Sequence, residues 1–409
     1  MALAALAPLA VASGGDEFDT VRVPAAQGVN VSAEAGKGVT FDAGDEFKAT
    51  LKSYLQAQYF FAARDSGNAD LSSVRIRTAR LILAGHVFDP VTRFALSLEG
   101  VDDGSQAVNN NGAVKDAWLM RRLYTHDDWT LDVRAGQQKT LYGRETTGTL
   151  SQQMFGDYSL AGRTFSGKRA RGANVLFSAM DQKLRASAGI FNTSPQSGGG
   201  FAVEEGSNGD NELNYLFGVR YDHKGDMGDM NFAQGDLGRS DDWNVGVGAN
   251  VYIGNERAAA TDVEVIGFNV NAVVKRKGLS GMFEFYSSSN ELDNGTPSVD
   301  SNGFNLQGTY MLENDIAVGA RFSLAAKDDP DPNGIGITPV SKGSAANGTA
   351  LAGDGQGDVQ EITLMAGKFF NGHSNKVLAE VTFQSVEPDQ VGAVDDDNII
   401  FKVSYAVIF

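Results

Sequence analysis

The chain has 409 residues, no cysteine and a formal net charge of −17 at pH 7. Without cysteine it can form neither a disulfide framework nor a thiolate metal site. The acidic balance argues against binding nucleic acid through a broad basic surface. No apolar run approaches the roughly 20 residues that a membrane-spanning helix requires. The composition therefore excludes several classes of protein, and nothing in it predicts a metal ion or another cofactor.

The first residues resemble the tail of a secretory signal peptide. Met1–Ala12 is a short apolar run, and Val11-Ala12-Ser13 resembles a small-residue cleavage site. The basic segment that usually precedes such a run is missing. Residues 1–13 are therefore interpreted as a signal-peptide remnant or, alternatively, as a mobile extension. Residues 14–45 are rich in Gly, Ala and acids without clear periodicity, and we expect a periplasmic lead-in before a single domain at 46–409.

Alternation of apolar and polar residues dominates that domain. Between Trp129 and Gly136, the odd-numbered residues are apolar and the even-numbered residues 130, 132 and 134 are polar, as in a strand with one apolar and one polar face. About sixteen such segments are predicted, near residues 47–61, 73–84, 92–100, 113–124, 129–136, 172–180, 183–192, 212–222, 243–254, 262–276, 280–288, 302–312, 315–325, 359–370, 375–386 and 397–409. Many short alternating segments separated by turns are the pattern of a transmembrane β-barrel.

The main alternative is a large soluble β-protein. A solenoid is disfavoured because no fixed short repeat occurs, and a sandwich would need a second sheet over every apolar face. In a bilayer, lipid covers those faces and closure of the barrel satisfies the backbone groups. Connections also alternate between tight turns, as at Met311–Asp315, and long loops, as at 327–358. We therefore predict an all-β fold, a transmembrane antiparallel barrel of about 16 strands, integral to a bacterial outer membrane.

A long basic segment without periodicity follows the strand at 129–136. We expect residues of about 141–171 to fold into the barrel and narrow it. The candidate constriction and anion-binding residues are Lys139, Arg144, Arg163, Lys168, Arg169 and Arg171, and the candidate lumen-wall residues are Arg80, Arg93, Arg121 and Arg134. Clustered Arg and Lys favour anions in a pore. Two alternatives stay open: a mixed-charge constriction in which acids pair with these bases, and no channel role at all.

Motifs between residues 36 and 192 follow one another in a characteristic order. They are Gly36-Lys37-Gly38-Val39-Thr40-Phe41 with Phe47-Lys48-Ala49-Thr50-Leu51, then Arg77-Thr78-Ala79-Arg80-Leu81-Ile82-Leu83-Ala84-Gly85, Phe94-Ala95-Leu96, Val114-Lys115-Asp116-Ala117-Trp118, Ala135-Gly136-Gln137-Gln138-Lys139-Thr140-Leu141-Tyr142-Gly143-Arg144-Glu145 and Gly189-Ile190-Phe191-Asn192. This order resembles the phosphate-selective porin O and P family. The resemblance implies a sixteen-stranded, trimeric outer-membrane channel with an in-folded third loop and passage of anions by charge. By motif, Lys139 and Arg144 carry over from the family.

The expected function is that of a porin, a passive diffusion channel for small hydrophilic solutes with a preference for anions such as phosphate. The alternative is a structural outer-membrane barrel, an envelope scaffold or attachment point with little or no conductance. An enzyme is not expected, because the four histidines, His86, His126, His223 and His373, stand apart without a recognisable nucleophile and base pattern. The acidic runs near 327–333 and 395–398 could bind calcium, but we expect solvated carboxylates or divalent bridges to lipopolysaccharide.

The last predicted strand ends in Phe409. Phe401, Val403, Tyr405 and Val407 precede it at alternating positions. This pattern resembles the signal that bacterial outer-membrane barrels present to their assembly machinery. The expected partners are therefore that machinery, through Phe409, together with outer-membrane lipid, lipopolysaccharide and two further copies of the chain in a homotrimer, and no nucleic acid.

Overall fold

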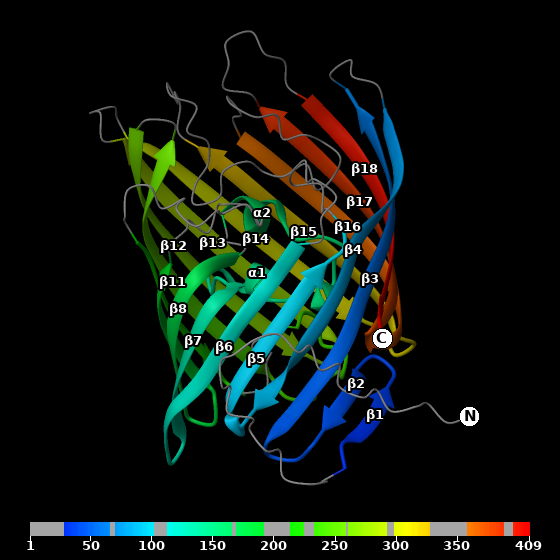
Figure 1. Ribbon diagram of the computed structural model, residues 1–409. Helices are drawn as coiled ribbons and strands as arrows, with labels where there is room; N and C mark the ends of the chain where they lie inside the picture. The colour runs from blue at the N-terminus through cyan, green and yellow to red at the C-terminus, as the bar shows by residue number, and fades with distance from the viewer. Residues whose placement is uncertain are drawn as a thin grey trace, which may run out of the picture.

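The computed structural model describes residues 28–65, 70–101, 113–165, 169–191, 213–224, 233–258, 261–292, 298–327, 358–387 and 396–409. Strands of this described part form a closed antiparallel barrel (Figure 1). Its sixteen strands are β3 (Phe47–Arg64), β4 (Leu71–Val87), β5 (Asp89–Glu99), β6 (Ala113–His126), β7 (Trp129–Lys139), β8 (Arg169–Ala179), β9 (Leu184–Phe191), β10 (Asn214–Asp222), β11 (Asn244–Ala258), β12 (Thr261–Arg276), β13 (Leu279–Leu292), β14 (Val299–Met311), β15 (Ile316–Lys327), β16 (Asp358–His373), β17 (Asn375–Glu387) and β18 (Asp396–Ile408). The predicted all-β barrel is confirmed.

Closure comes from the pairing of the last strand with the first. The register of β18 on β3 runs from Asn398 opposite Arg64 to Ile408 opposite Tyr54. Every other strand of the barrel pairs with its neighbours in the chain, so the topology is a simple meander. Closure removes the free edges that an open sheet of this size would expose.

The predicted alternation separates the two faces of the barrel. On β12, Ile266, Phe268 and Val270 point outward and are 57%, 44% and 39% exposed, whereas Asn269 and Asn271 point inward and are buried. Apolar side chains recur on the outer face of the other strands, where a bilayer can cover them. In the described part of the chain, no helix is long and apolar enough to cross a membrane.

A small hairpin precedes the barrel. It consists of β1 (Asn30–Glu34) and β2 (Gly38–Asp42), and it lies at the end of the barrel that carries the short turns (Figure 1). β2 pairs with β3, with Val39 opposite Leu51, just beyond the point where β18 ends. The hydrogen bond from the Lys48 ammonium, 2.7 Å from the carboxylate of Asp42, lowers the pKa of Asp42 below its ordinary value. The expected lead-in thus contains a regular hairpin that the sequence pattern did not indicate.

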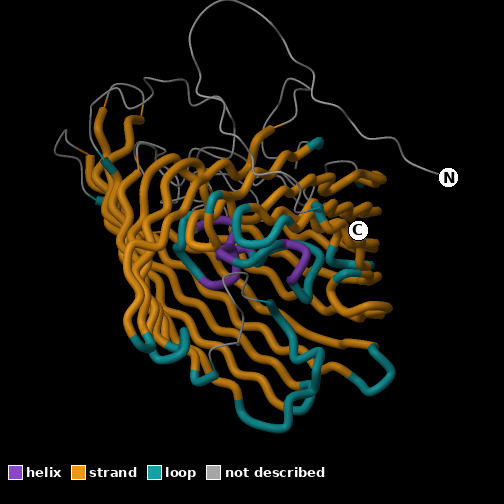
Figure 2. Tube along the Cα trace, turned by 60° about the horizontal axis from the view of Figure 1, so that its bottom comes forward, coloured by secondary structure: helices purple, strands orange, loops and turns teal. Residues whose placement is uncertain are grey.

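The segment between β7 and β8 lies inside the barrel, as predicted. It contains α1 (Arg144–Thr147), η1 (Leu150–Gln152) and α2 (Leu160–Phe165). Figure 2 shows these short helices surrounded by the ring of strands. We call residues 140–165 the lumen loop.

Candidate functional site

The lumen loop leans against one side of the barrel. Its helix α2 packs on β13, β14 and β15. Tyr142 and Phe165 of the loop are fully buried, and their ring centroids lie 5.9 Å and 5.7 Å from that of Tyr286 on β13. This apolar contact, inside a barrel whose inner face is otherwise largely polar, holds the loop on one wall rather than across the middle.

Gly143 makes the close approach of the loop possible. Its φ of 79° and ψ of 151° belong to a region that is essentially restricted to glycine. A Cβ atom at this position would lie 2.3 Å from the hydroxyl oxygen of Tyr286. Any other residue would therefore strain the backbone and push the loop off the wall at the same time.

Charged contacts fix the loop to the same wall. Arg163 lies 2.8 Å from Glu361 on β16, and the backbone amide of Gly156 donates to Glu380 on β17 at 2.9 Å. The backbone amide of Glu145 donates to Glu284 on β13 at 3.2 Å. The acids of this wall thus face the loop, where Arg163 pairs with one of them and backbone amides donate hydrogen bonds to the other two.

The two acids of the loop are also turned away from the open lumen. The Glu145 carboxylate accepts from the amide of Ser159 at 3.0 Å and lies 3.7 Å from Arg321. Asp157 lies 2.8 Å from Arg77 on β4. Both carboxylates are buried, so the loop contributes no negative charge to the space on its other side.

That other side holds a cavity of about 660 Å³ between the loop and the opposite wall. Its cationic lining residues are Lys52, Arg80, Arg93, Arg134, Lys139 and Arg169, and its one carboxylate among the described residues is that of Asp116. Hydroxyl and amide groups of the loop, from Thr147, Thr149, Ser151 and Gln152, complete the lining.

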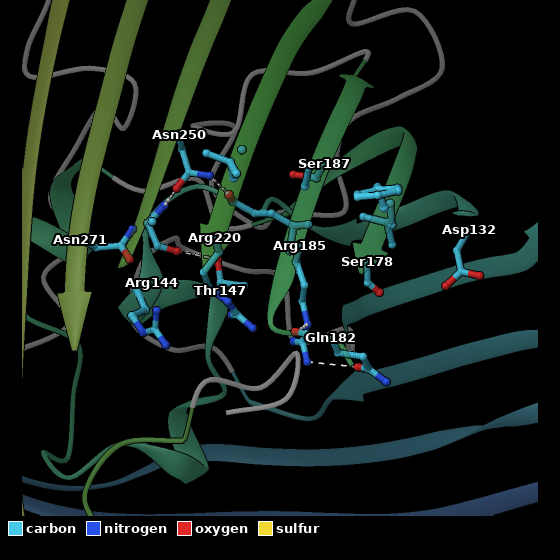
Figure 3. Close-up of a pocket in the computed structure, with 18 of the residues that line it drawn as sticks. Asp132, Arg144, Thr147, Ser178, Gln182, Arg185, Ser187, Arg220, Asn250 and Asn271 are labelled. Atoms are coloured by element: carbon cyan, nitrogen blue, oxygen red, sulfur yellow. Dashed lines mark hydrogen bonds between the residues drawn. The ribbon is translucent and has the colours of Figure 1, made fainter. Parts of the chain in front are cut away.

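A second cavity of about 240 Å³ continues along the same wall (Figure 3). Its cationic lining residues are Arg93, Arg122, Arg144, Arg185 and Arg220, with Asp132 as the one lining carboxylate in the described part of the chain. Arg93 lines both cavities and therefore connects them. Each consecutive strand from β3 to β10 supplies at least one cation. We call the whole set the basic lane: Lys52, Arg80, Arg93, Arg122, Arg134, Lys139, Arg144, Arg169, Arg185 and Arg220.

Some of the lane is paired with acids. Arg80 lies 2.8 Å from Glu99, Arg169 lies 3.0 Å from Asp116, and Arg122 lies 2.8 Å from Asp132. Arg144 and Arg220 share a single carboxylate, that of Asp222, at 2.9 Å and 2.7 Å. Asp222 therefore binds two of the cations that line the second cavity.

Three other cations of the lane pair with no carboxylate of the described residues. Arg93 donates to the carbonyl oxygen of Pro90 at 3.5 Å, and Arg134 donates to Gln138 and lies over the ring of Trp118. Lys139 donates to the carbonyl oxygens of residues 146 and 147 at 3.2 Å each. The lane therefore carries a net positive charge even after its ion pairs are counted.

The structure places the residues predicted for the site in different surroundings. Six of them belong to the basic lane: Lys139, Arg144, Arg169, Arg80, Arg93 and Arg134. Arg163 is buried on the far side of the loop, and Arg171 donates to Gln137 and lines neither cavity. Arg121 points to the outer face, where it pairs with Asp89 at 3.2 Å. Lys168 lies outside the described residues, and the roles of all ten residues remain predictions.

Four members of the lane were missed in the sequence: Lys52, Arg122, Arg185 and Arg220. The alternation of inward and outward residues along each strand could have identified them as facing the lumen. Arg220 stands between the outward residues Val219 and Tyr221, which are 50% and 38% exposed, so its own side chain must point inward. The same parity distinguishes Arg122 from its outward neighbour Arg121.

Metal-binding groups do not gather in the described ranges, where no three His, Asp or Glu side chains could hold one ion. Most of the acidic run near 327–333, and the first residue of the run at 395–398, lie outside the described residues. What we expect of these runs, solvated carboxylates or divalent bridges in place of a calcium site, stays a prediction.

Comparison with known families decides what kind of barrel this is. The model of the phosphate-selective porin O and P family matches residues 49–312, well over half of the chain. The chain belongs to this family. It is therefore an outer-membrane porin, an integral β-barrel channel protein and not an enzyme, as the motifs indicated. No curated protein sequence matches the chain.

Solved structures support the fold of this porin. An anion-selective porin from Comamonas acidovorans aligns with a TM-score of 0.58 and 11% identity, over 88% of this chain and 99% of that one. The outer-membrane channel DcaP of Acinetobacter baumannii aligns with a TM-score of 0.57 and 12% identity, over 90% and 99%. The trimer form of OmpT from Vibrio cholerae aligns with a TM-score of 0.52 and 13% identity, over 88% of this chain and 99% of that one. At these identities the likeness extends to the fold alone.

Proposed function

We propose that this porin is a passive diffusion channel that prefers anions, with phosphate among its solutes. The observation that carries the proposal is the basic lane. Cations outnumber carboxylates in both cavities, and the acids of the opposite wall and of the lumen loop are buried against cations and hydrogen-bond donors. A solute that passes the loop on its open side meets cations on nearly every strand that it crosses.

The preference for anions has an electrostatic basis, because the lane is positively charged whereas the chain as a whole is negatively charged. A cleft of one sign of charge with low-dielectric walls concentrates ions of the opposite sign. The net charge of −17 on the whole chain opposes this only weakly, because screening limits a distant charge to a range of about 8 Å at physiological ionic strength. The local charge of the lane therefore decides which ions enter.

Phosphate is the preferred candidate among anions for a chemical reason. Guanidinium groups bind phosphate oxygens in a bidentate manner and retain their charge at every relevant pH. Arg144, Arg185 and Arg220 line one small cavity (Figure 3), where a tetrahedral oxyanion could contact more than one of them. The family description, phosphate-selective, agrees with this assignment.

We further propose that the functional form is a homotrimer that contacts outer-membrane lipid and lipopolysaccharide. The trimer form of the OmpT structure supports the oligomeric state by likeness of fold. We also propose that the assembly machinery recognises the last strand through Phe409, whose side chain is 60% exposed and free to be contacted.

The experiment that tests the function is a reversal-potential measurement on the purified porin in a planar bilayer under a KCl gradient. A potential of the sign expected for chloride, together with a chloride current that phosphate reduces, supports the proposal. A potential of the opposite sign contradicts anion preference and leaves a general porin. A folded, inserted protein that passes no current contradicts the channel and favours the alternative, a structural barrel.

A further inference from the structure

The connection between β10 and β11 differs from the other turns at its end of the barrel. β10 ends at Asp222 and β11 begins at Asn244, whereas β14 and β15 are separated by the four residues 312–315. In an outer-membrane barrel the end with short turns faces the periplasm. The structure describes residues 223–224 and 233–243 of this connection. We call the stretch 233–240 the strap.

The strap lies along the rim of the barrel, where it forms hydrogen bonds with two neighbouring turns. The amide of Lys277 donates to the carbonyl of Ser240 at 2.8 Å, and the amide of Gly278 donates to the carboxylate of Asp236 at 2.8 Å. Arg239 donates to the carbonyl oxygen of Met311. These bonds bind the strap to the β12–β13 and β14–β15 turns, so its position is set by specific contacts.

The strap then reaches the underside of the lumen loop. The amide of Gln234 donates to the carbonyl of Gln152 at 2.9 Å, and the side-chain oxygen of Gln234 accepts from the amide of Met154 at 3.0 Å. Lys275 on β12 donates to the carbonyl of Ala233 at 2.7 Å, and a ring nitrogen of His373 lies 2.8 Å from the carbonyl of Gln234. Gln234 is 6% exposed, and it joins the loop to His373 at the end of β16, while Ala233 next to it contacts β12.

An apolar cluster also holds the strap against the lumen loop. Leu237 of the strap packs against this cluster. The buried members come from the loop and from the inner wall, and they are Met154, Phe155, Met311, Ala317, Met365, Phe369 and Leu378. Inward-facing residues of a water-filled pore are usually polar. Apolar residues at these inner positions are favourable only where something covers them, and here the loop and the strap do so.

The strap lies away from the path of the ions. No residue of 233–240 lines either of the two cavities of the basic lane. Gln152 connects the strap to the larger cavity. It is one of the residues that line this cavity, and its backbone carbonyl accepts a hydrogen bond from the strap. The strap and the lane therefore lie on opposite sides of the lumen loop.

We propose that residues 233–240 are a second constriction element of this porin, which holds the lumen loop against the β13–β17 wall and so confines permeating ions to the basic lane. Gln234 is the positioning residue, since it bonds both ends of the loop segment 152–154, and Leu237 completes the apolar contact. In the conductance test, this inference depends on the proposed channel function. A cross-linking test is therefore added that does not depend on current.

Two variants remove the strap to different extents. Gln234→Ala with Leu237→Ser removes the side-chain bond and the apolar contact and leaves the connection intact. A second variant replaces residues 225–243 with Asn-Gly, a dipeptide that favours two-residue hairpins, since the register of β10 on β11 would bring residue 224 opposite 244. The matched control is Asp241→Ala, on the same connection, whose side chain is exposed.

The expected result is a pore that is wider and less selective without the strap. Single-channel conductance should rise about twofold or more, with larger current fluctuations and a reversal potential closer to zero, because ions gain a path outside the charged lane. The control should match the native protein. Native conductance and selectivity in both strap variants would overturn the inference while leaving the proposed channel function intact.

The cross-linking test uses the absence of cysteine from the chain. Gln152→Cys with Gln234→Cys introduces the sole thiols of the protein at two positions whose backbones are joined by a hydrogen bond of 2.9 Å, and a disulfide forms only between residues that lie close together. Oxidation of the folded barrel should cross-link this pair, detected by mass and gel mobility, but not the control pair Gln152→Cys with Asp241→Cys. Failure of the first pair to cross-link in the folded barrel would overturn the inference even if the porin proved non-conducting.

Discussion

The guanidinium of Arg163 lies 2.8 Å from the carboxylate of Glu361, and both side chains are buried between the lumen loop and the β16 strand. Gln384 donates to the same carboxylate at 2.8 Å. We infer from this burial and pairing that the pair anchors the loop. It lies on the opposite side of the loop from the basic lane.

Arg163→Gln should loosen the loop strongly. Removing one partner of a buried pair costs about 3–5 kcal/mol, and at Glu361 the nearby Arg321 and Lys402 offset part of that loss. We expect a lower unfolding temperature, followed by circular dichroism, and more current noise in single channels. Arg163→Gln combined with Glu361→Gln should recover most of the loss, because neither charge is then left unpaired. Equal unfolding temperatures for the native protein and the single variant would contradict the anchor.

A second prediction compares two arginines that differ in the face on which they lie. Arg93 lines both cavities, whereas Arg121, on the adjacent strand, is outward and paired with Asp89. A unit charge acting across about 8 Å of water contributes about 0.5 kcal/mol. The charge attracts an anion and repels a cation by this amount, so Arg93→Gln should lower the anion-to-cation permeability ratio about fivefold, measured as a reversal potential under a KCl gradient.

Arg121→Gln is the matched control for Arg93→Gln. It removes the same charge from the same region of the barrel, but outside the lumen. The permeability ratio should stay at the native value in this variant. If the two variants shifted the ratio equally, overall charge rather than the lane would control selectivity.

Most of the fold could be predicted from the sequence because the physical constraint is local. A strand between lipid and water must alternate, and alternation is visible one residue at a time. The strap and the β1–β2 hairpin have no such signal. The conformation of residues 233–240 depends on contacts with residues 152–154, which are remote in the chain, and no short-range pattern records these contacts.

The candidate site was predictable where a strand carries it. Arg80, Arg93 and Arg134 stand on strands, so parity places them once the lipid face is known. Arg163 stands in the lumen loop and Arg169 is the first residue of β8, so no alternating pattern precedes either residue to predict the direction of its side chain. One is buried against Glu361 and the other lines the lane, and only the fold of the loop distinguishes them.

A third prediction concerns Gly143. Its backbone conformation costs other residues about 1–3 kcal/mol, and a Cβ atom would lie 2.3 Å from the hydroxyl of Tyr286. Gly143→Ala should therefore displace the loop, lower the unfolding temperature and alter the conductance. Gly308→Ala on β14 is the control, because no atom lies within 4 Å of the added Cβ there. A native unfolding temperature and conductance in Gly143→Ala would contradict the proposed docking of the loop.

The last prediction uses salt to separate a diffuse field from a binding site. The Debye length falls from about 10 Å at 0.1 M to about 3 Å at 1 M salt. Selectivity that arises from the summed field of the lane should therefore fall as the mean KCl concentration rises at a fixed gradient ratio. Reversal potentials measured over this range test the expectation, and a selectivity that does not change with salt would contradict a field-based mechanism.

Block by phosphate should respond less steeply to the same increase in salt. Direct hydrogen bonds between arginines and a phosphate oxyanion act at contact distance, where salt screens less than it does across the lumen. Arg144, Arg185 and Arg220 are the residues that line the smaller cavity and could make such bonds. If block and selectivity declined in parallel, phosphate would be held by the general field, and Arg185→Gln would then weaken block no more than Arg93→Gln does.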